Sequence, residues 1–269
     1  MNSEEFLPIL IRYSNNHLNI PALWYACLIG DKKAVELFVK VGISANGTAL
    51  NNAIKSGNIE IVEFLINYGV KPNSGSLATA AECNNCAAIR TLLKHGADMY
   101  DGEDPTHFDH ETALECAAKN GNIEAMQIFI DLNYDIDESY CPWDETLLTN
   151  VINEHSIGKI KKPEIIIRTV SFLLDRGADI NLCSQTYGTP LAAAFNGPHS
   201  HVDLIALLIN RGAEVTPNII MHALKSKAGK NSITALLAFG INNESTQMLN
   251  FDSYPELKDQ LIKYGFLGS

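Results

Sequence analysis

Two groups of side chains in the sequence could do chemistry. Residues 101–111 hold His107 and His110 among five carboxylates, and imidazole and carboxylate groups together could bind a divalent metal ion. Cys83 and Cys86 have the spacing of half a zinc site. The histidines follow no known metal spacing, however, and no second cysteine pair follows at zinc-finger distance. We therefore expect a solvated acidic loop, structural cysteines, no metal and no cofactor.

Catalytic motifs are missing from the sequence. No nucleophile elbow or other local signature accompanies the eight histidines, and no segment reads as a phosphate-binding loop. We expect no catalytic residues. A metal-dependent protein or enzyme that uses His107, His110 and the acidic segment stays an alternative, which metal analysis of the purified protein would test.

The glycines reveal what positions these side chains, because six of them end similar apolar segments. Aligned on these glycines, the chain resolves into seven copies of one unit, with Asn133 in the glycine's place in the fourth copy. Asparagine, like glycine, tolerates the left-handed backbone conformation that often ends a helix. The glycines are Gly42, Gly69, Gly96, Gly177, Gly212 and Gly240.

Each copy has the pattern of two helices. A Leu-x-x-Ala segment recurs at a period of 27 residues in the first three copies, as at Leu50 and Ala53 of the second copy. There Thr48 is expected to cap a short first helix, Gly57-Asn58 to end it, and apolar residues over 59–66 to form one flank of a longer second helix. Neither helix can bury its apolar flank alone, so the copies must stack.

Four segments resemble the ankyrin-repeat family. They are Gly188-Thr189-Pro190-Leu191, Thr112-Ala113-Leu114, Gly121-Asn122-Ile123-Glu124, and residues 174–181 with the sequence LDRGADIN. The resemblance covers roughly residues 21 to 243. It implies an all-α solenoid of stacked helix pairs with short hairpin or loop fingers. The first two junctions are shorter than that between Gly177 and Thr189, so their fingers are expected to be tight turns.

The expected organisation is one elongated domain with a cap at each end. Residues 1–20 are expected to form an N-terminal capping helix through Phe6, Leu10 and Tyr13, and residues 244–269 a degenerate C-terminal capping repeat. The predicted repeats are 21–47, 48–74, 75–108, 109–143, 144–185, 186–216 and 217–243.

Net charge and hydropathy exclude several classes of protein. A net charge of −11 argues against a nucleic-acid partner. No apolar run is long enough to span a bilayer, and the acidic first residues do not read as a secretion signal. We expect a monomer in the cytoplasm, or one delivered to a host cytosol by a route that needs no signal peptide.

The two edges of the expected solenoid differ in charge. Carboxylates gather on the finger side, and lysines on the opposite edge. The lysines could serve solubility and the helix dipoles, or they could form a docking edge for an acidic segment or an anionic membrane. They are Lys32, Lys33, Lys55, Lys119, Lys159, Lys161, Lys162, Lys225, Lys227 and Lys230.

Aromatic residues lie among the finger-side carboxylates and on the first helix of the first copy. Aromatic anchors dominate interface energetics, and acidic neighbours would steer a basic partner protein toward them. The resemblance implies a non-catalytic scaffold or adaptor that binds a protein in the groove of fingers and first helices. The alternative is a host-directed effector of an intracellular bacterium or virus that recruits or inhibits a eukaryotic protein. The predicted partner-binding residues are Trp24, Tyr25, Tyr100, Asp101, Asp104, Phe108, Tyr140, Trp143, Asp144 and Tyr187.

Overall fold

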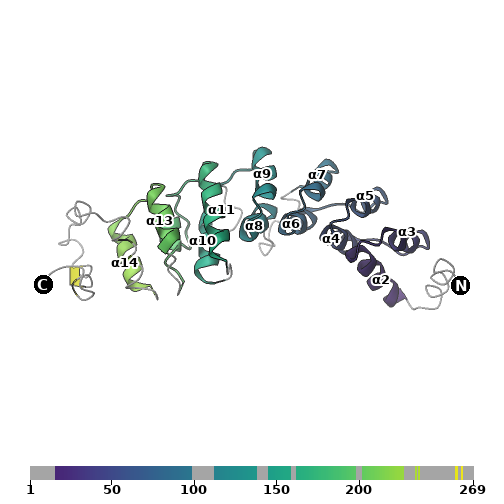
Figure 1. The fold of residues 1–269 in the computed structure, drawn as a ribbon, viewed down its shortest axis with the longest axis horizontal. Coiled ribbons are helices and arrows are strands. Elements are labelled where there is room, and N and C mark those ends of the chain that lie inside the picture. The colour runs from purple at the N-terminus through teal and green to yellow at the C-terminus, as the bar shows by residue number, and fades with distance from the viewer. Residues whose placement is uncertain are drawn as a thin grey trace. The chain divides into compact units, whose positions relative to one another are not determined.

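The computed structural model describes residues 16–98, 112–137, 145–158, 162–197 and 202–226, together with Thr234, Leu236, Lys258, Asp259 and Ile262. Over these residues the regular secondary structure is helical, as Figure 1 shows. The described residues hold one isolated β-bridge, between Ser184 and Gly188. The expected all-α class is therefore confirmed.

The chain divides into two compact units, which we describe separately. Unit 1 comprises Met1–Ala117 with Glu124–Asp131, and unit 2 comprises Ala118–Ile123 with Leu132–Ser269. The sequence had indicated one continuous domain. The division runs through the fourth helix pair, α8 (Ala113–Asn120) and α9 (Ile123–Asp131).

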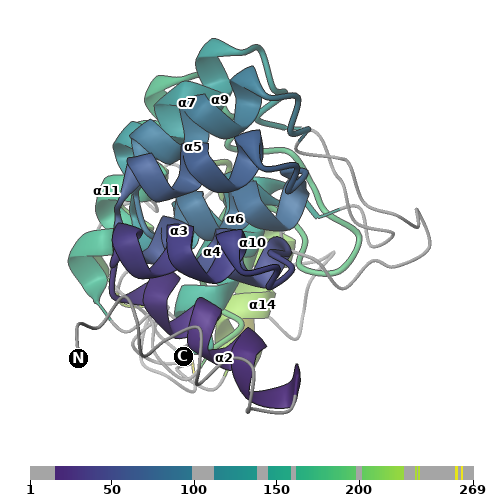
Figure 2. The ribbon, with the colours of Figure 1, turned by 90° about the vertical axis from the view of Figure 1, so that its right-hand side faces the viewer.

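Unit 1 contains three helix pairs ahead of α8. Within each pair the two helices pack together, α2 on α3, α4 on α5 and α6 on α7. The first helices α2, α4 and α6 then pack on one another, and the second helices α3, α5 and α7 form a parallel row (Figure 2). The helices are α2 (Asn16–Leu28), α3 (Lys32–Lys40), α4 (Gly47–Ser56), α5 (Ile59–Asn67), α6 (Ser74–Glu82) and α7 (Cys86–Lys94).

Unit 2 repeats the arrangement with less regular helices. Its pairs are α10 on α11 and α12 on α13, and its first helices pack in the order α10, α12, α14. The first helix of the sixth copy, α12, is only four residues long. The helices are α10 (Leu147–Ser156), α11 (Pro163–Asp175), α12 (Pro190–Ala193), α13 (Val202–Asn210) and α14 (Pro217–Lys225).

The core follows the Leu-x-x-Ala pattern. Leu50 and Ala53 are completely buried, and the corresponding residues of the other copies are at most 3% exposed. The small alanine allows neighbouring first helices to approach closely. The pattern that defined the repeats in the sequence is therefore the pattern that buries apolar area between them.

One helix cap differs from its prediction. Asn46, not Thr48, caps α4, because the Asn46 side chain accepts a hydrogen bond from the backbone N–H of Ala49 at 3.1 Å. Asn73 caps α6 in the same way, from the equivalent position 27 residues later. Since these helices begin early, α4 has ten residues and α5 nine, so the first helix is not the shorter one. Residues 43–46 and 70–73 that precede them contain no strand, as expected for tight turns.

The predicted helix ends are confirmed. Gly57 follows α4 in the left-handed conformation, with φ of 76°, and Asn58 caps α5 by accepting from Glu60 and Ile61. Asn133 has φ of 61°, in the left-handed region, where the other described copies have a glycine. The substitution of asparagine for glycine therefore kept the backbone conformation that ends a second helix.

The predicted caps lie largely outside the described residues. Helix α2 begins at Asn16, so the expected boundary between residues 20 and 21 falls inside a helix. Phe6, Leu10 and Tyr13 lie outside the described residues, as does most of 244–269. Both caps stay predictions.

The cysteine prediction needs a correction. Cys86 begins α7 and is only half-buried, and Cys83 is exposed at the end of α6. Neither is therefore a core residue. Cys27 of α2 is the buried one, and burial raises the pKa of its thiol to about 11.

Candidate partner-binding surface

Three of the ten predicted binding residues lie in the described parts of the chain: Trp24, Tyr25 and Tyr187. The finger residues of the third and fourth junctions lie outside the described residues and stay predictions. These are Tyr100, Asp101, Asp104, Phe108, Tyr140, Trp143 and Asp144.

Trp24 joins two repeats. Its indole Nε1 donates a hydrogen bond to Asn46 Oδ1 at 3.2 Å, and its backbone carbonyl accepts one from Asn52 Nδ2 at 3.3 Å. The ring is partly buried. Trp24 therefore holds α2 against α4 and offers a partner only part of its surface.

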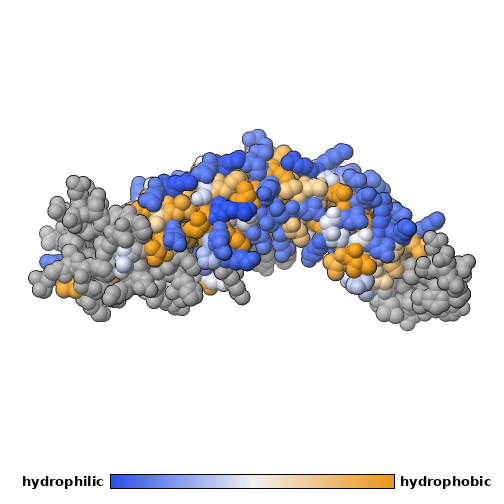
Figure 3. Space-filling view, viewed as in Figure 1, coloured by the Kyte–Doolittle hydropathy of each residue, from blue (hydrophilic) through white to orange (hydrophobic). Residues whose placement is uncertain are grey.

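Tyr25 is free of these contacts and 63% exposed. Leu28 and Ile29 on the same helix are 45% and 57% exposed, and Pro21 is exposed as well. We call Pro21, Tyr25, Leu28 and Ile29 the α2 stripe. Figure 3 shows hydrophobic residues gathered over the helices near the N-terminal end of the described chain. Large apolar side chains grouped on a surface are typical of a binding site.

The α2 stripe is a local feature of the first copy. At the positions 27 residues later, α4 has Thr48, Asn52, Lys55 and Ser56 in place of the four apolar residues. The third copy has Gly75, Thr79, Glu82 and Cys83 there. The other first helices thus surround the stripe with polar groups, as the rim of an interface does.

Sequence reasoning missed Leu28 and Ile29, because it sought aromatic residues in long junctions. The signal was available in the alignment of copies, where Leu28 takes the place of a charged residue in each of the next three copies, Lys55, Glu82 and Lys119. An apolar residue at a position that is otherwise charged is a better sign of a binding surface than residue type alone.

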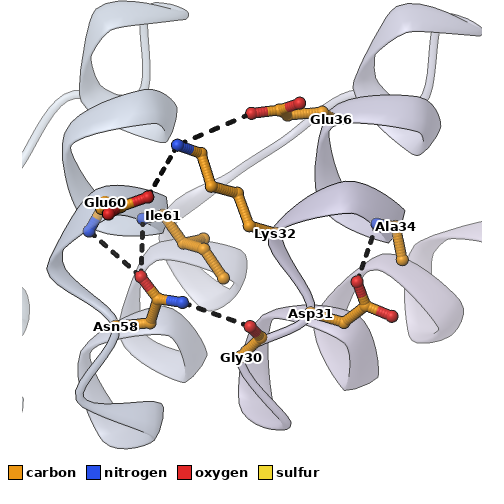
Figure 4. Close-up of polar contacts among 8 residues, drawn as sticks. All are labelled: Gly30, Asp31, Lys32, Ala34, Glu36, Asn58, Glu60 and Ile61. Carbon is orange, nitrogen blue, oxygen red and sulfur yellow. Dashed lines mark hydrogen bonds and ion pairs between the residues drawn. The ribbon is translucent and has the colours of Figure 1, made fainter.

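The predicted basic edge begins with a paired lysine. Lys32 Nζ lies 2.8 Å from Glu60 Oε2 of the next copy and 3.8 Å from Glu36 Oε1, as Figure 4 shows. The hydrogen bond to Glu60 raises the pKa of Lys32, and the same bond lowers the pKa of Glu60. Beside this pair, Asn58 Nδ2 donates to the carbonyl of Gly30 at 3.2 Å. Lys32 therefore links two copies and offers a ligand less charge than a free lysine.

Acidic residues on the finger side of unit 2 also link copies. Both carboxylate oxygens of Asp137 lie 3.0 Å from the backbone nitrogen of Asp179, which donates to them. Burial raises the pKa of Asp137, and the charges of Asp179 and Asp135 raise it further, whereas the Asp179 N–H acts in the opposite direction. These carboxylates serve the repeat-to-repeat contact.

Tyr187 lies in the finger that the isolated bridge defines. Its backbone N–H donates to Ser184 Oγ at 3.0 Å, and its side chain is half-buried. Ser184 and Gly188 exchange two backbone hydrogen bonds, at 2.9 and 3.2 Å. This junction has the length that the sequence associated with a hairpin finger.

The described residues contain no group of three histidine, cysteine or acidic side chains that could hold a metal ion. His107 and His110 lie outside them. Within the same described residues, no helix is long and apolar enough to span a bilayer.

Comparisons with known proteins identify the fold. A family model described as "Ankyrin repeats (3 copies)" matches residues 1–76. The crystal structure of the human ASB11 ankyrin repeat domain matches with a TM-score of 0.60 and 22% identity, over 79% of this chain and 96% of that one. The ankyrin repeat domain of Bcl-3, a member of the IκB protein family, matches with a TM-score of 0.54 and 21% identity, over 80% of this chain and 97% of that one. No curated protein matched in a sequence comparison.

Proposed function

Because the chain is an ankyrin-repeat protein, we propose that it is a non-catalytic protein–protein interaction module that binds its partner through the surface of its first helices. Ankyrin repeats generally serve as such modules. Stacked repeats create an extended surface that a single helix pair lacks. The observation that carries the proposal is the α2 stripe, on the first helix of the first copy.

The stripe has the composition of an interface centre. Tyrosine combines a large apolar ring with a hydroxyl group, and residues of this kind contribute most of the binding energy in protein interfaces. Leu28 and Ile29 add apolar area within one helical turn of Tyr25. The polar residues of α4 and α6 at equivalent positions would form the rim.

The predicted finger residues would extend this surface. Residues 16–98 contain seven lysines or arginines and six acidic residues, so the described N-terminal part is close to neutral although the chain carries −11. Acidic steering of a basic partner would therefore come from later junctions, through Asp101, Asp104 and Asp144. The aromatic anchors proposed there are Tyr100, Phe108, Tyr140 and Trp143.

The test is affinity capture with three forms of the full chain, analysed by mass spectrometry. One form is the wild type, one carries Tyr25→Gln with Leu28→Gln, and one carries alanine at the four finger aromatics. We expect a protein that the wild type captures and the Tyr25/Leu28 variant loses. Equal capture by the wild type and that variant would contradict a role for the first-helix surface. Tyr68→Gln is the matched control, because Tyr68 is a tyrosine that is 52% exposed, directly after α5.

A further inference from the structure

We propose that the α2 stripe binds a helix of the partner, which lies where a preceding first helix would lie in the stack. The inference rests on the proposed function and names the kind of partner that this surface fits. The partner helix would present leucine and alanine without a charged group, because the stripe offers no counter-charge to a buried one.

The stripe continues an interface that the chain already contains. The first helices α2, α4 and α6 pack one on the next, and within the described residues α2 is the first member of the row. Asn52 shows which way its position faces, because its side chain reaches back to the carbonyl of Trp24 on the preceding helix. Tyr25 occupies the equivalent position of α2, so it faces the place of a preceding first helix.

The spacing of the stripe fits a helical partner. Pro21, Tyr25, Leu28 and Ile29 follow one another at intervals of four, three and one residues, which places them on one side of a helix. Such a row of apolar residues is the recognition pattern for a second helix packed alongside. A loop or an extended strand would not cover the row continuously.

The sequence ahead of α2 has the pattern of a second helix. Leu10-Ile11-Arg12-Tyr13 matches Leu65-Ile66-Asn67-Tyr68 at the end of α5, and Phe6 and Leu7 precede it as Ile61 and Val62 do in the second copy. The family model also counts three copies in residues 1–76, although residues 21–74 account for two. The preceding copy thus contributes a second-helix sequence next to α2, and the place beside the stripe suits a first helix.

The probe is a peptide of residues 46–58, which is a first helix of this chain with both caps. A hydrocarbon staple would join positions 48 and 55, because Thr48 and Lys55 are exposed on α4 and the packed sides then stay free. Isolated helices of this length are marginal in water, so the staple is needed. Binding of the labelled peptide to the full chain is measured by fluorescence anisotropy.

We expect saturable binding that Tyr25→Gln or Leu28→Gln weakens at least about tenfold and Tyr68→Gln leaves unchanged. A peptide with Leu50→Asn and Ala53→Asn should not bind. Absence of saturable binding, or equal binding by the Tyr25 variant, would overturn the inference. If the Tyr25/Leu28 variant nevertheless loses its captured protein, the proposed function stands and only the helical partner is refuted.

A photo-crosslinker at position 25 of the full chain distinguishes other occupants of the stripe. Adducts with a helical segment of another protein are the expected result. Adducts with residues 1–15 of the same chain, or with a second copy, would show that the stripe is already covered and would overturn the inference.

Discussion

The indole nitrogen of Trp24 lies 3.2 Å from Asn46 Oδ1, and this same oxygen caps α4 by accepting the backbone N–H of Ala49. One asparagine side chain therefore begins the second copy and fastens the first copy to it. Because the two roles share one atom, a single substitution should remove both.

Asn46→Ala should lower the free energy of unfolding by about 1–2 kcal/mol, the usual effect of losing an N-cap, together with the Trp24 bond. Asn46→Asp should stay within about 0.5 kcal/mol of the wild type, since a carboxylate can accept both bonds and suits a helix N-terminus. Urea unfolding followed by circular dichroism measures the difference. Equal stability of the alanine variant would contradict the capping role.

The sequence predicted the interior of the repeats better than their edges. Leu50, Ala53 and Gly57 were correctly placed, because burial and a left-handed turn leave each position few acceptable residue types. The cap at Asn46 was missed because Thr48 occupies the family's usual threonine position, and a helix can begin two residues earlier when its junction is short. Several polar residues can cap a helix, so local sequence alone does not decide which one does.

The candidate surface was predicted only in part for a different reason. Tyr25 was found by residue type, whereas the role of Trp24 in packing depends on a contact 22 residues away along the chain. Leu28 and Ile29 are ordinary apolar residues in the sequence. Their exposure becomes visible only when the neighbours of α2 are known.

Asp137→Asn should stabilise the protein at pH 7. In the next copy the equivalent residue is Asn181, whose side chain accepts from the Glu214 N–H and donates to the Gly212 carbonyl. A carboxylate at this position can accept but cannot donate, and its pKa is raised in the folded chain. Since Asp137 is mostly open to solvent, we expect a gain of only about 0.5 kcal/mol.

The pH dependence has a definite sign. A raised pKa means that the folded chain binds the Asp137 proton more tightly, so this group's contribution to stability is full below pH 3.8, its ordinary pKa, and is lost as the pH rises through the folded value. The advantage of Asp137→Asn should therefore shrink as the pH falls toward 4. Asn181→Asp is the converse control and should be destabilising at pH 7. An Asp137→Asn variant that is no more stable than the wild type at pH 7 would contradict this.

Gly197→Ala should be strongly destabilising. A Cβ at Gly197 would lie 1.5 Å from the backbone oxygen of Ser156 at the end of α10, so either backbone must move. We expect a loss of about 3 kcal/mol or more. Gly47→Ala is the matched control, because a Cβ there meets nothing within 4 Å, and it should gain about 0.5 kcal/mol in α4. Thermal unfolding of both variants would be compared, and similar midpoints would refute the close approach.

Thiol labelling should separate the cysteines of unit 1. Cys83 is exposed and should react with a maleimide in the folded protein, whereas Cys27 is buried with a pKa of about 11 and should react only after unfolding. Mass spectrometry of labelled peptides with and without urea gives both values. Labelling of Cys27 at the rate of Cys83 would show that α2 opens readily from α4.

The most direct test of the proposed first-helix surface is photo-crosslinking from two tyrosine positions. Benzoylphenylalanine replaces Tyr25 in one full-length chain and Tyr68 in another, and both are irradiated in the same cell extract. We predict a protein adduct from position 25 that Leu28→Gln abolishes and that position 68 does not form. Adducts of equal yield from both positions, or none from position 25, would contradict binding through the α2 stripe.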